Sequence, residues 1–211
     1  MTAKDMFSHR VSILTGHYGT GKTEVSVNLA LALAAEGEQV MLADLDIVNP
    51  YFRSRERRPL LEKAGVRVIS SSQACSDADV PALPAELLTI LENREIRGIL
   101  DIGGDPVGAR VLARFQPKIV QEDYQSAAAY LRSIEAVTGL TCSGLVNNTH
   151  LCGETTPAEI RKGVALAQEV SRQTGIPILC HTAERRFLES LSDLGEPVFP
   201  IAINMKKPWE R

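Results

Sequence analysis

The most constraining feature of the sequence is a glycine-rich motif, GHYGTGKT at residues 16–23, which matches the pattern GxxxxGK[ST] at every specified position. An apolar stretch, Val11–Leu14, precedes it and a helical pattern, Lys22–Glu36, follows it. In such a strand–loop–helix unit the glycines let successive backbone N–H groups point at an anion, and the helix dipole adds to the attraction. The motif therefore predicts a loop that binds the phosphates of a nucleoside triphosphate. The competing interpretation is an ordinary glycine-rich turn.

Two side chains of the motif have separate expected roles. Lys22 can reach the β- and γ-phosphates, which makes it a candidate catalytic residue, and the Thr23 hydroxyl can be a ligand of Mg²⁺. The residues expected to contact the nucleotide at this end of the chain are Gly16, His17, Gly19, Thr20, Gly21, Lys22, Thr23 and Glu24.

Short apolar runs alternate with helix-length segments along the whole chain, which predicts an α/β fold with a doubly wound, mostly parallel sheet flanked by helices. A capping box begins the helix at Thr156–Thr174, where Thr156 is followed by Pro157 and Glu159. No linker or repeat interrupts residues 1–211, so we expect one domain. The predicted strands after the first are Gln39–Asp46, Val66–Ser70, Ile96–Ile102, Cys142–Asn147, Pro177–His181 and Pro197–Ile201.

One stretch departs from this alternation. A doubly wound fold should place a strand between the helical patterns at Pro106–Phe115 and Gln125–Val137. Only Lys118–Val120 is available, and it reads as too short and too polar for a central strand. Either the sheet is irregular here or the sequence has lost a segment.

Acidic side chains end two of the predicted strands, where open α/β sheets place their ligands. Asp101 ends the strand before Gly103, and Asp44 and Asp46 end the second strand as D-x-D. We expect Asp101 to hold the magnesium shell, directly or through water, and the amide of Gly104 to sense a γ-phosphate. The alternative for Asp44 and Asp46 is that they cap the next turn.

Composition excludes other classes of function. The net charge of -3 and the low aromatic content of 5% disfavour nucleic-acid binding. Neither a signal peptide nor a membrane span is apparent, and the four cysteines have no CxxC spacing, so a reduced cytoplasmic setting is expected. An iron–sulfur or zinc site is expected only if two subunits pool their thiols.

Together, the segments GHYGTGKTEVSVNLALALA, LADLDIVNP, ILDIGGDP and GLVNNTH resemble the ParA/MinD-type P-loop ATPases, a group that includes the nitrogenase iron protein, over about two-thirds of the chain. The resemblance implies ATP and Mg²⁺ as cofactors, with Thr23, Asp46 and Asp101 around the metal. It implies that Asp46 is also catalytic, because it would orient the attacking water or its magnesium. It places Asn148, with its neighbour Asn147, where the group's strand-end asparagine contacts adenine; the alternative is a pair of turn residues.

Two further features bear on the partners. His17 stands where such loops usually carry a lysine that reaches the partner subunit's nucleotide. In a homodimer, either histidine is a weaker, pH-sensitive substitute or this contact across the dimer is absent. The C-terminal INMKKPWER is too short and contains Pro208, which does not support a membrane-targeting helix. The arginines after the second strand are either a solvated charge run or a patch that meets a partner or a phosphate: Arg53, Arg55, Arg57 and Arg58.

The leading hypothesis is an ATPase, a nucleotide hydrolase that binds ATP or ADP and whose nucleotide state controls an unidentified protein partner. The alternatives are a small-molecule kinase or ATP-dependent ligase on a related fold, a GTPase, and a nucleotide sensor without catalysis. The pattern Asp101-x-x-Gly104 favours a GTPase, whereas the absence of an NKxD motif argues against it. His150 is expected to be a surface residue.

Overall fold

The computed structural model describes residues 1–17, 19–46, 54–70, 86–103, 118–120 and 124–205. Its centre is an eight-stranded sheet in the order β3-β2-β4-β1-β5-β6-β7-β8, in which every strand pair is parallel. The doubly wound, parallel α/β fold expected from the sequence is confirmed. The strands are β1 Val11–Gly16, β2 Gln39–Leu45, β3 Arg67–Ser70, β4 Ile96–Ile102, β5 Lys118–Val120, β6 Leu145–Asn147, β7 Ile178–Glu184 and β8 Val198–Ile201.

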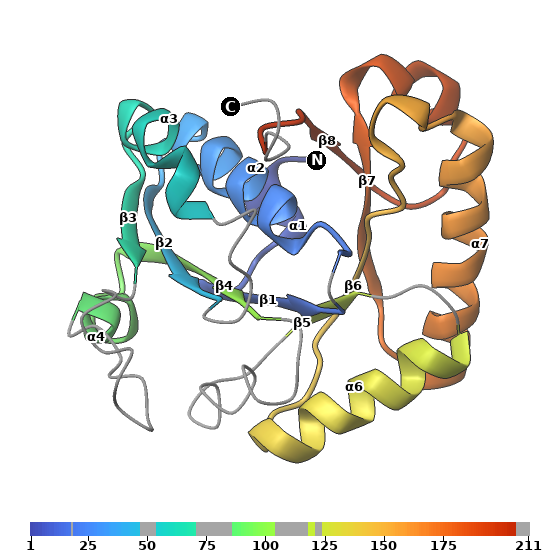
Figure 1. The fold of residues 1–211 in the computed structure, drawn as a ribbon, viewed down its shortest axis with the longest axis horizontal. Helices are drawn as coiled ribbons and strands as arrows, with labels where there is room; N and C mark the ends of the chain where they lie inside the picture. Colours follow the sequence, from blue (N-terminus) through green and yellow to red (C-terminus); the bar gives the residue numbers. More distant parts are fainter. Residues whose placement is uncertain (18, 47–53, 71–85, 104–117, 121–123, 206–211) are drawn as a thin grey trace.

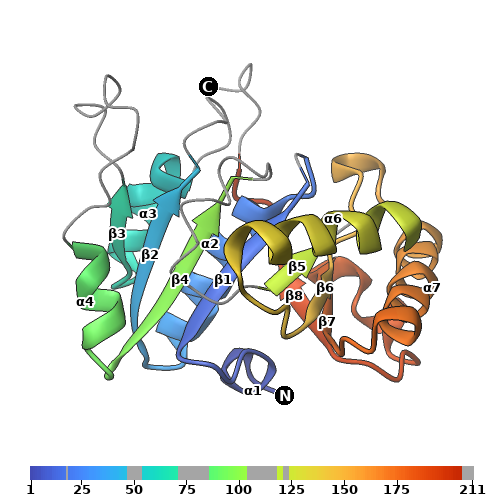
Figure 2. The same cartoon turned by 90° about the horizontal axis from the view of Figure 1, so that it is seen from below.

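Helices cover both faces of the sheet (Figure 1). The α-helices are α1 Ala3–Met6, α2 Lys22–Ala35, α3 Arg58–Lys63, α4 Glu86–Glu92, α6 Tyr124–Thr138 and α7 Pro157–Thr174. Short 3₁₀ segments lie between them: η1 Ser54–Arg57, η4 Cys152–Glu154, η5 Arg185–Phe187 and η6 Glu189–Leu191. Seen from below, α4 lies at the β3 end of one face, and α6 and α7 lie toward the other end (Figure 2). No helix of the described residues is long and apolar enough to cross a membrane.

Side-chain alternation along the strands divides the core into two layers. Val40 and Leu42 of β2 pack with Leu29 of α2 on one face, whereas Met41 of β2 packs with Ile90 of α4 on the opposite face. The strands nearest the centre are buried on both faces, and this explains why they read as continuous apolar runs.

The interpretation of Lys118–Val120 as unsuitable for a central strand is wrong. This segment forms β5, which pairs with β1 on one side and with β6 on the other. Three residues suffice because β5 pairs only with the carboxyl end of β1, Leu14–Gly16, and with a single residue of β6, Leu145. The sheet thus continues through the segment that seemed to lack a strand. The helix expected at 106–115 lies outside the described residues.

The other predicted elements agree with the structure to within a few residues at each end. α7 begins at Pro157, and the Thr156 hydroxyl accepts a hydrogen bond from the Glu159 N–H at 3.3 Å, as the capping motif predicts. α7 ends at Gly175, whose φ of 73° is the left-handed conformation that glycine adopts readily at a helix end. These boundaries direct the chain from β6 back to β7 and leave the carboxyl ends of both strands at the same edge as the glycine-rich loop.

Candidate nucleotide-binding site

The glycine-rich loop connects the end of β1 directly to the start of α2. Gly19 and Gly21 have φ of 84° and 75°, which side chains with a β-carbon rarely adopt, so glycine is needed at both positions. Gly21 is the residue before α2, and no side chain caps the helix there. The N–H groups of the first helical turn have no partners within the helix, and such a turn is a ready-made anion site.

The loop is closed by contacts to a single carbonyl oxygen, that of His17. It accepts hydrogen bonds from the Thr20 N–H at 3.3 Å, from the Thr20 hydroxyl at 2.8 Å and from Lys22 Nζ at 3.2 Å. The His17 residue is exposed, whereas Lys22 is 8% exposed. The buried Lys22 ammonium lies at the start of α2, and its charge together with the positive end of the helix dipole suits this place to a polyphosphate.

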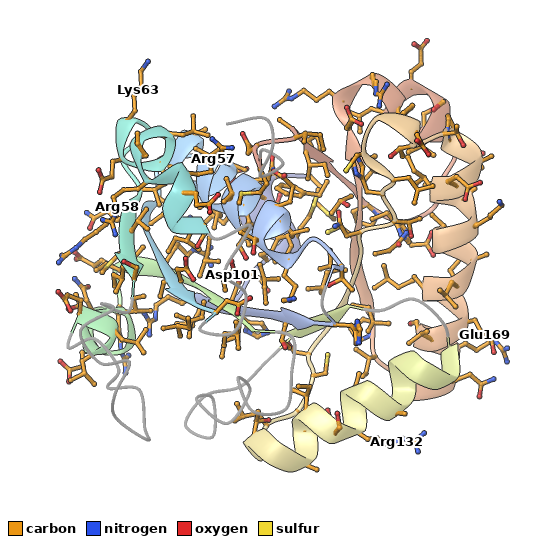
Figure 3. All side chains as sticks on the ribbon, in the orientation of Figure 1. Arg57, Arg58, Lys63, Asp101, Arg132 and Glu169 are labelled. Atoms are coloured by element: carbon orange, nitrogen blue, oxygen red, sulfur yellow. The ribbon has the colours of Figure 1, made fainter. Side chains whose placement is uncertain are left out.

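Three aspartates lie beside this loop, as the strand-end pattern predicts. The register of β2 against β4 sets Asp44 opposite Asp101, and both are 1% exposed. Asp46 is 9% exposed, and a β-carbon placed on Gly103 would lie 3.0 Å from its Oδ1. The residues after β2 and after β4 therefore converge on the side of the sheet that α2 covers, where Figure 3 shows Asp101.

The environment of Asp101 disfavours a bare carboxylate. Burial raises the pKa of Asp101 to about 7, and the neighbouring carboxylates of Asp44 and Asp46 contribute in the same direction. The Thr23 hydroxyl and the Lys22 ammonium act in the opposite direction, toward a lower pKa. Among the described residues, neither oxygen of Asp101 accepts a hydrogen bond of good geometry. Such a group requires a proton or a cation.

These residues fit a hard cation such as Mg²⁺, whose preferred ligands are oxygen atoms. Thr23, Asp46 and Asp101 are the side chains that would hold it. Within the part of the chain that the structure describes, no group of three His, Cys, Asp or Glu side chains could by itself hold a metal ion. Phosphate oxygens and water would therefore have to supply further ligands, as is usual for magnesium in phosphate-binding sites.

The two asparagines at the carboxyl end of β6 turn in different directions. Asn147 is 8% exposed; its Nδ2 donates to Nδ1 of the buried His181 at 3.1 Å, and its Oδ1 accepts from the Thr149 hydroxyl at 2.6 Å. Burial lowers the pKa of His181, which favours the neutral ring that accepts this bond. Asn148 faces the glycine-rich loop instead, and its Nδ2 donates to the Thr20 carbonyl at 2.8 Å. Only Asn148 of this pair contacts the predicted site.

Glu24, expected to contact the nucleotide, binds the segment that follows β8. Its carboxylate accepts the backbone N–H of Asn204 at 2.7 Å and that of Met205 at 2.9 Å. Asn28, one turn further along α2, exchanges two hydrogen bonds with the backbone of Ala202, donating at 2.9 Å and accepting at 2.8 Å. The sequence offered no local signal for this contact, because the partners are more than 170 residues apart.

Replacing Asn28 with alanine should therefore destabilise the protein. The change removes the acceptor of the Ala202 N–H and one of the two donors to the Ala202 carbonyl oxygen, the other being Asn204 Nδ2 at 3.1 Å, which we expect to lower the free energy of unfolding by about 2–3 kcal/mol. For a chain of this size, that lowers the midpoint of thermal unfolding by roughly 5–10 °C. Circular dichroism on heating measures it, with the exposed Gln173→Ala as the control. A variant that unfolds at the wild-type temperature would contradict this role.

The remaining candidate residues are the arginines after β2, Gly104 and His150. Arg57 and Arg58 lie in the η1–α3 segment (Figure 3), where Arg58 pairs with Glu62 at 3.1 Å and donates to Ser70 Oγ at 3.3 Å. Arg53 and Gly104 lie outside the described residues. His150, expected at the surface, has a side chain only 12% exposed, because Glu184 Oε1 lies 3.2 Å from its Nε2.

A family profile and several curated proteins match parts of this chain. Residues 6–55 match the ParA family profile described as "NUBPL iron-transfer P-loop NTPase". A cytosolic Fe-S cluster assembly factor, cfd1 of Emericella nidulans, is 36% identical over 95 residues, which are 45% of this chain and 26% of the relative. The iron-sulfur cluster carrier protein of Escherichia coli is 50% identical over 40 residues, 19% of this chain and 11% of the relative. The alignments thus span about a quarter or less of the curated relatives' length.

Solved structures share the fold. The signal recognition particle receptor FtsY of Elizabethkingia anophelis, in complex with GDP, superposes with a TM-score of 0.53 at 20% identity, over 80% of this chain and 55% of that one. A nucleotide-binding protein of Archaeoglobus fulgidus, in complex with ADP, gives 0.52 at 19% identity, over 92% and 91%. The profile match covers the glycine-rich loop and the aspartates that end β2. Residues 6–55 of the chain are thus similar to the P-loop NTPases of the ParA family, as the sequence motifs predict.

Proposed function

We propose that the chain is a magnesium-dependent ATPase whose nucleotide state controls a protein partner. The observation that carries this proposal is the convergence of Lys22, the start of α2 and the buried carboxylates of Asp46 and Asp101 at one edge of the sheet. A triphosphate bound by the loop would place its terminal phosphate toward these carboxylates. When bound, Mg²⁺ would neutralise the charge on the phosphates.

Each side chain has a separate task in this proposal. Lys22 offsets negative charge that builds on the transferred phosphoryl group. Asp46 lies at the partly accessible end of the cluster, at 9% exposure against 1% for Asp44 and Asp101, and so is the carboxylate best placed to accept a hydrogen bond from an attacking water. Residues 47–53 follow Asp46 directly, so a change at Asp46 on hydrolysis would be passed to that segment and to the arginines after it.

The named relatives supply a first class of partner to test. Their descriptions concern iron–sulfur clusters, so the switch would regulate the handling of such a cluster, as cargo, by this chain or by its partner. Of the described cysteines, Cys142 and Cys180 are buried and Cys152 is exposed. Cluster binding by this chain would therefore require thiolates from two copies. Absorbance after anaerobic addition of iron and sulfide, with and without Cys152→Ser, tests this cargo separately from nucleotide binding.

The central experiment is phosphate release from ATP with and without magnesium, on the wild-type chain and on Asp46→Asn. We expect the wild type to release phosphate only with magnesium. Asp46→Asn should bind ATP within about threefold of wild-type affinity but hydrolyse it about 100-fold more slowly, because an amide is a poor proton acceptor. Asp5→Asn, on the exposed start of α1, is the control.

Two results would change the proposal. Hydrolysis by Asp46→Asn at the wild-type rate would remove Asp46 from catalysis. Transfer of the phosphate to an added metabolite, and not to water, would favour the kinase alternative, and tighter binding of GTP than of ATP by calorimetry would favour a GTPase.

A further inference from the structure

The side chain of Asn148 joins three segments that are far apart in the sequence. Its Nδ2 donates to the carbonyl oxygen of Thr20 in the glycine-rich loop at 2.8 Å. Its Oδ1 accepts a hydrogen bond from the Thr182 hydroxyl of β7. A carbonyl oxygen can only accept, so Asn148 must present its nitrogen to Thr20, and the hydroxyl on β7 is then left to the oxygen. Thr182 thus fixes which end of Asn148 faces the loop.

The contact controls a particular peptide group of the loop. The Thr20 carbonyl and the Gly21 N–H belong to one planar, trans peptide unit, in which C=O and N–H point in opposite directions. A donor that holds the Thr20 carbonyl toward β6 therefore directs the Gly21 N–H away from β6. Because Gly21 immediately precedes α2, that N–H is one of the donors available to an anion at the helix start.

Packing at Gly21 supports the same conclusion independently. A β-carbon placed on Gly21 would overlap Asn148 Nδ2, so the amide lies directly against the glycine backbone. At Gly19, in contrast, no described residue beyond its chain neighbours has an atom within 4 Å of such a carbon. Asn148 thus restrains the part of the loop next to Lys22, where glycine would otherwise allow many conformations. Restraint before binding lowers the entropy that the loop loses when a ligand orders it.

We propose that Asn148 is a positioning residue, oriented by Thr182, that holds the Thr20–Gly21 peptide in the conformation that binds phosphate. The inference rests on the proposed function, since it concerns the same nucleotide. It differs from the base-contacting role that the family resemblance implies for Asn148. Because positioning acts on the phosphates, replacing Asn148 should weaken the binding of every polyphosphate ligand by the same factor, whatever its base.

The test measures magnesium-dependent binding of three ligands by calorimetry: a non-hydrolysable ATP analogue, the matching GTP analogue, and inorganic tripolyphosphate, which has no base. Asn148→Ala should weaken all three by about the same factor, roughly tenfold or more, the size expected for one lost hydrogen bond in a restrained loop. Asn148→Asp should weaken them further, because a carboxylate would face the Thr20 carbonyl. Asn93→Ala is the control, because this exposed residue lies in the turn between α4 and β4, before the amino end of that strand.

Variants at Thr182 separate positioning from a general structural role. Thr182→Val removes the hydroxyl that orients Asn148 and should reproduce the uniform loss in weaker form, whereas Thr182→Ser keeps the hydroxyl and should restore wild-type affinity. Hydrogen exchange of the Gly21 and Lys22 amides in the ligand-free protein provides a second readout. It should accelerate in Asn148→Ala and Thr182→Val and remain at the wild-type rate in Thr182→Ser.

The outcomes distinguish this inference from the proposed function. A loss confined to the ATP analogue, with tripolyphosphate bound as before, means that Asn148 contacts the base and overturns the positioning role. Unchanged affinities or unchanged exchange at Gly21 overturn it as well. A wild-type chain that binds none of the three ligands overturns the proposed function, and with it any role of Asn148 in nucleotide binding.

Discussion

Replacing Lys22 with alanine should weaken binding of a magnesium–ATP analogue by about 100-fold or more. The ammonium is buried at the start of α2, where Nζ donates a hydrogen bond to the His17 carbonyl oxygen at 3.2 Å, so its charge lies at the loop that would bind the phosphates. Hydrogen bonds that involve a charged partner are worth about 1.5–3 kcal/mol each, and Lys22 can make more than one. The rate of ATP hydrolysis should fall together with the affinity, because no ammonium at this position then offsets the negative charge of the terminal phosphate.

The same change should alter the acidic cluster. Lys22 is one of the groups that lower the pKa of Asp101, so without it that pKa should rise above its wild-type value of about 7. Lys162→Ala is the matched control: this lysine is exposed on α7 and pairs with Glu159 at 2.7 Å, far along the chain from the loop. Calorimetry at pH 7.5 measures the affinities. A Lys22→Ala variant that binds within threefold of the wild type would show that the loop amides alone account for binding.

The sequence alone predicted those parts of the site that depend on one strand and on the turn that follows it. The strand before the loop, the helix after it, and the meeting of Asp44 with Asp101 all follow from local patterns and from the rule that parallel strands end at one edge. β5 was misjudged because length and polarity describe a segment in isolation. Its place in the sheet comes from pairing with the ends of β1 and β6, which no local pattern contains.

The residues that the sequence left open depend on long-range contacts. Asn147 and Asn148 are adjacent, and alternation at a strand end turns one inward and the other toward the loop, but only the neighbouring elements decide which. Thr182 lies inside β7 and belongs to no sequence motif, although its hydroxyl orients Asn148. Glu24 lies next to the motif and reads as part of it, yet its carboxylate accepts hydrogen bonds from the backbone of Asn204 and Met205, near the other end of the sequence.

Replacing Asp101 with asparagine should stabilise the ligand-free protein at pH 8 and remove its response to magnesium nucleotide. The pKa of Asp101 is raised from 3.8 to about 7, so folding favours the protonated carboxyl. This contribution to stability is complete below about pH 4 and is lost as the pH rises through about 7. Asparagine has the shape of the neutral acid and does not ionise. Its advantage over the wild type should therefore be close to zero below pH 4, grow to about 1–2 kcal/mol at pH 5 and reach about 4 kcal/mol at pH 8.

Thermal unfolding at pH 5 and pH 8, with and without magnesium and an ATP analogue, measures both effects. In the wild type, a proton and Mg²⁺ compete for the same oxygens, so the affinity for the magnesium nucleotide should rise with pH, by up to about tenfold per unit below pH 7, and level off above it. Asp101→Asn should lose most of this affinity and its pH dependence. Asp193→Asn is the control, since Arg161 lowers the pKa of that exposed carboxylate, and the change should not stabilise the protein at pH 8. If Asp101→Asn unfolds below the wild type at pH 8 without ligand, the ionised Asp101 is stabilised by the fold, and the cluster does not need a cation.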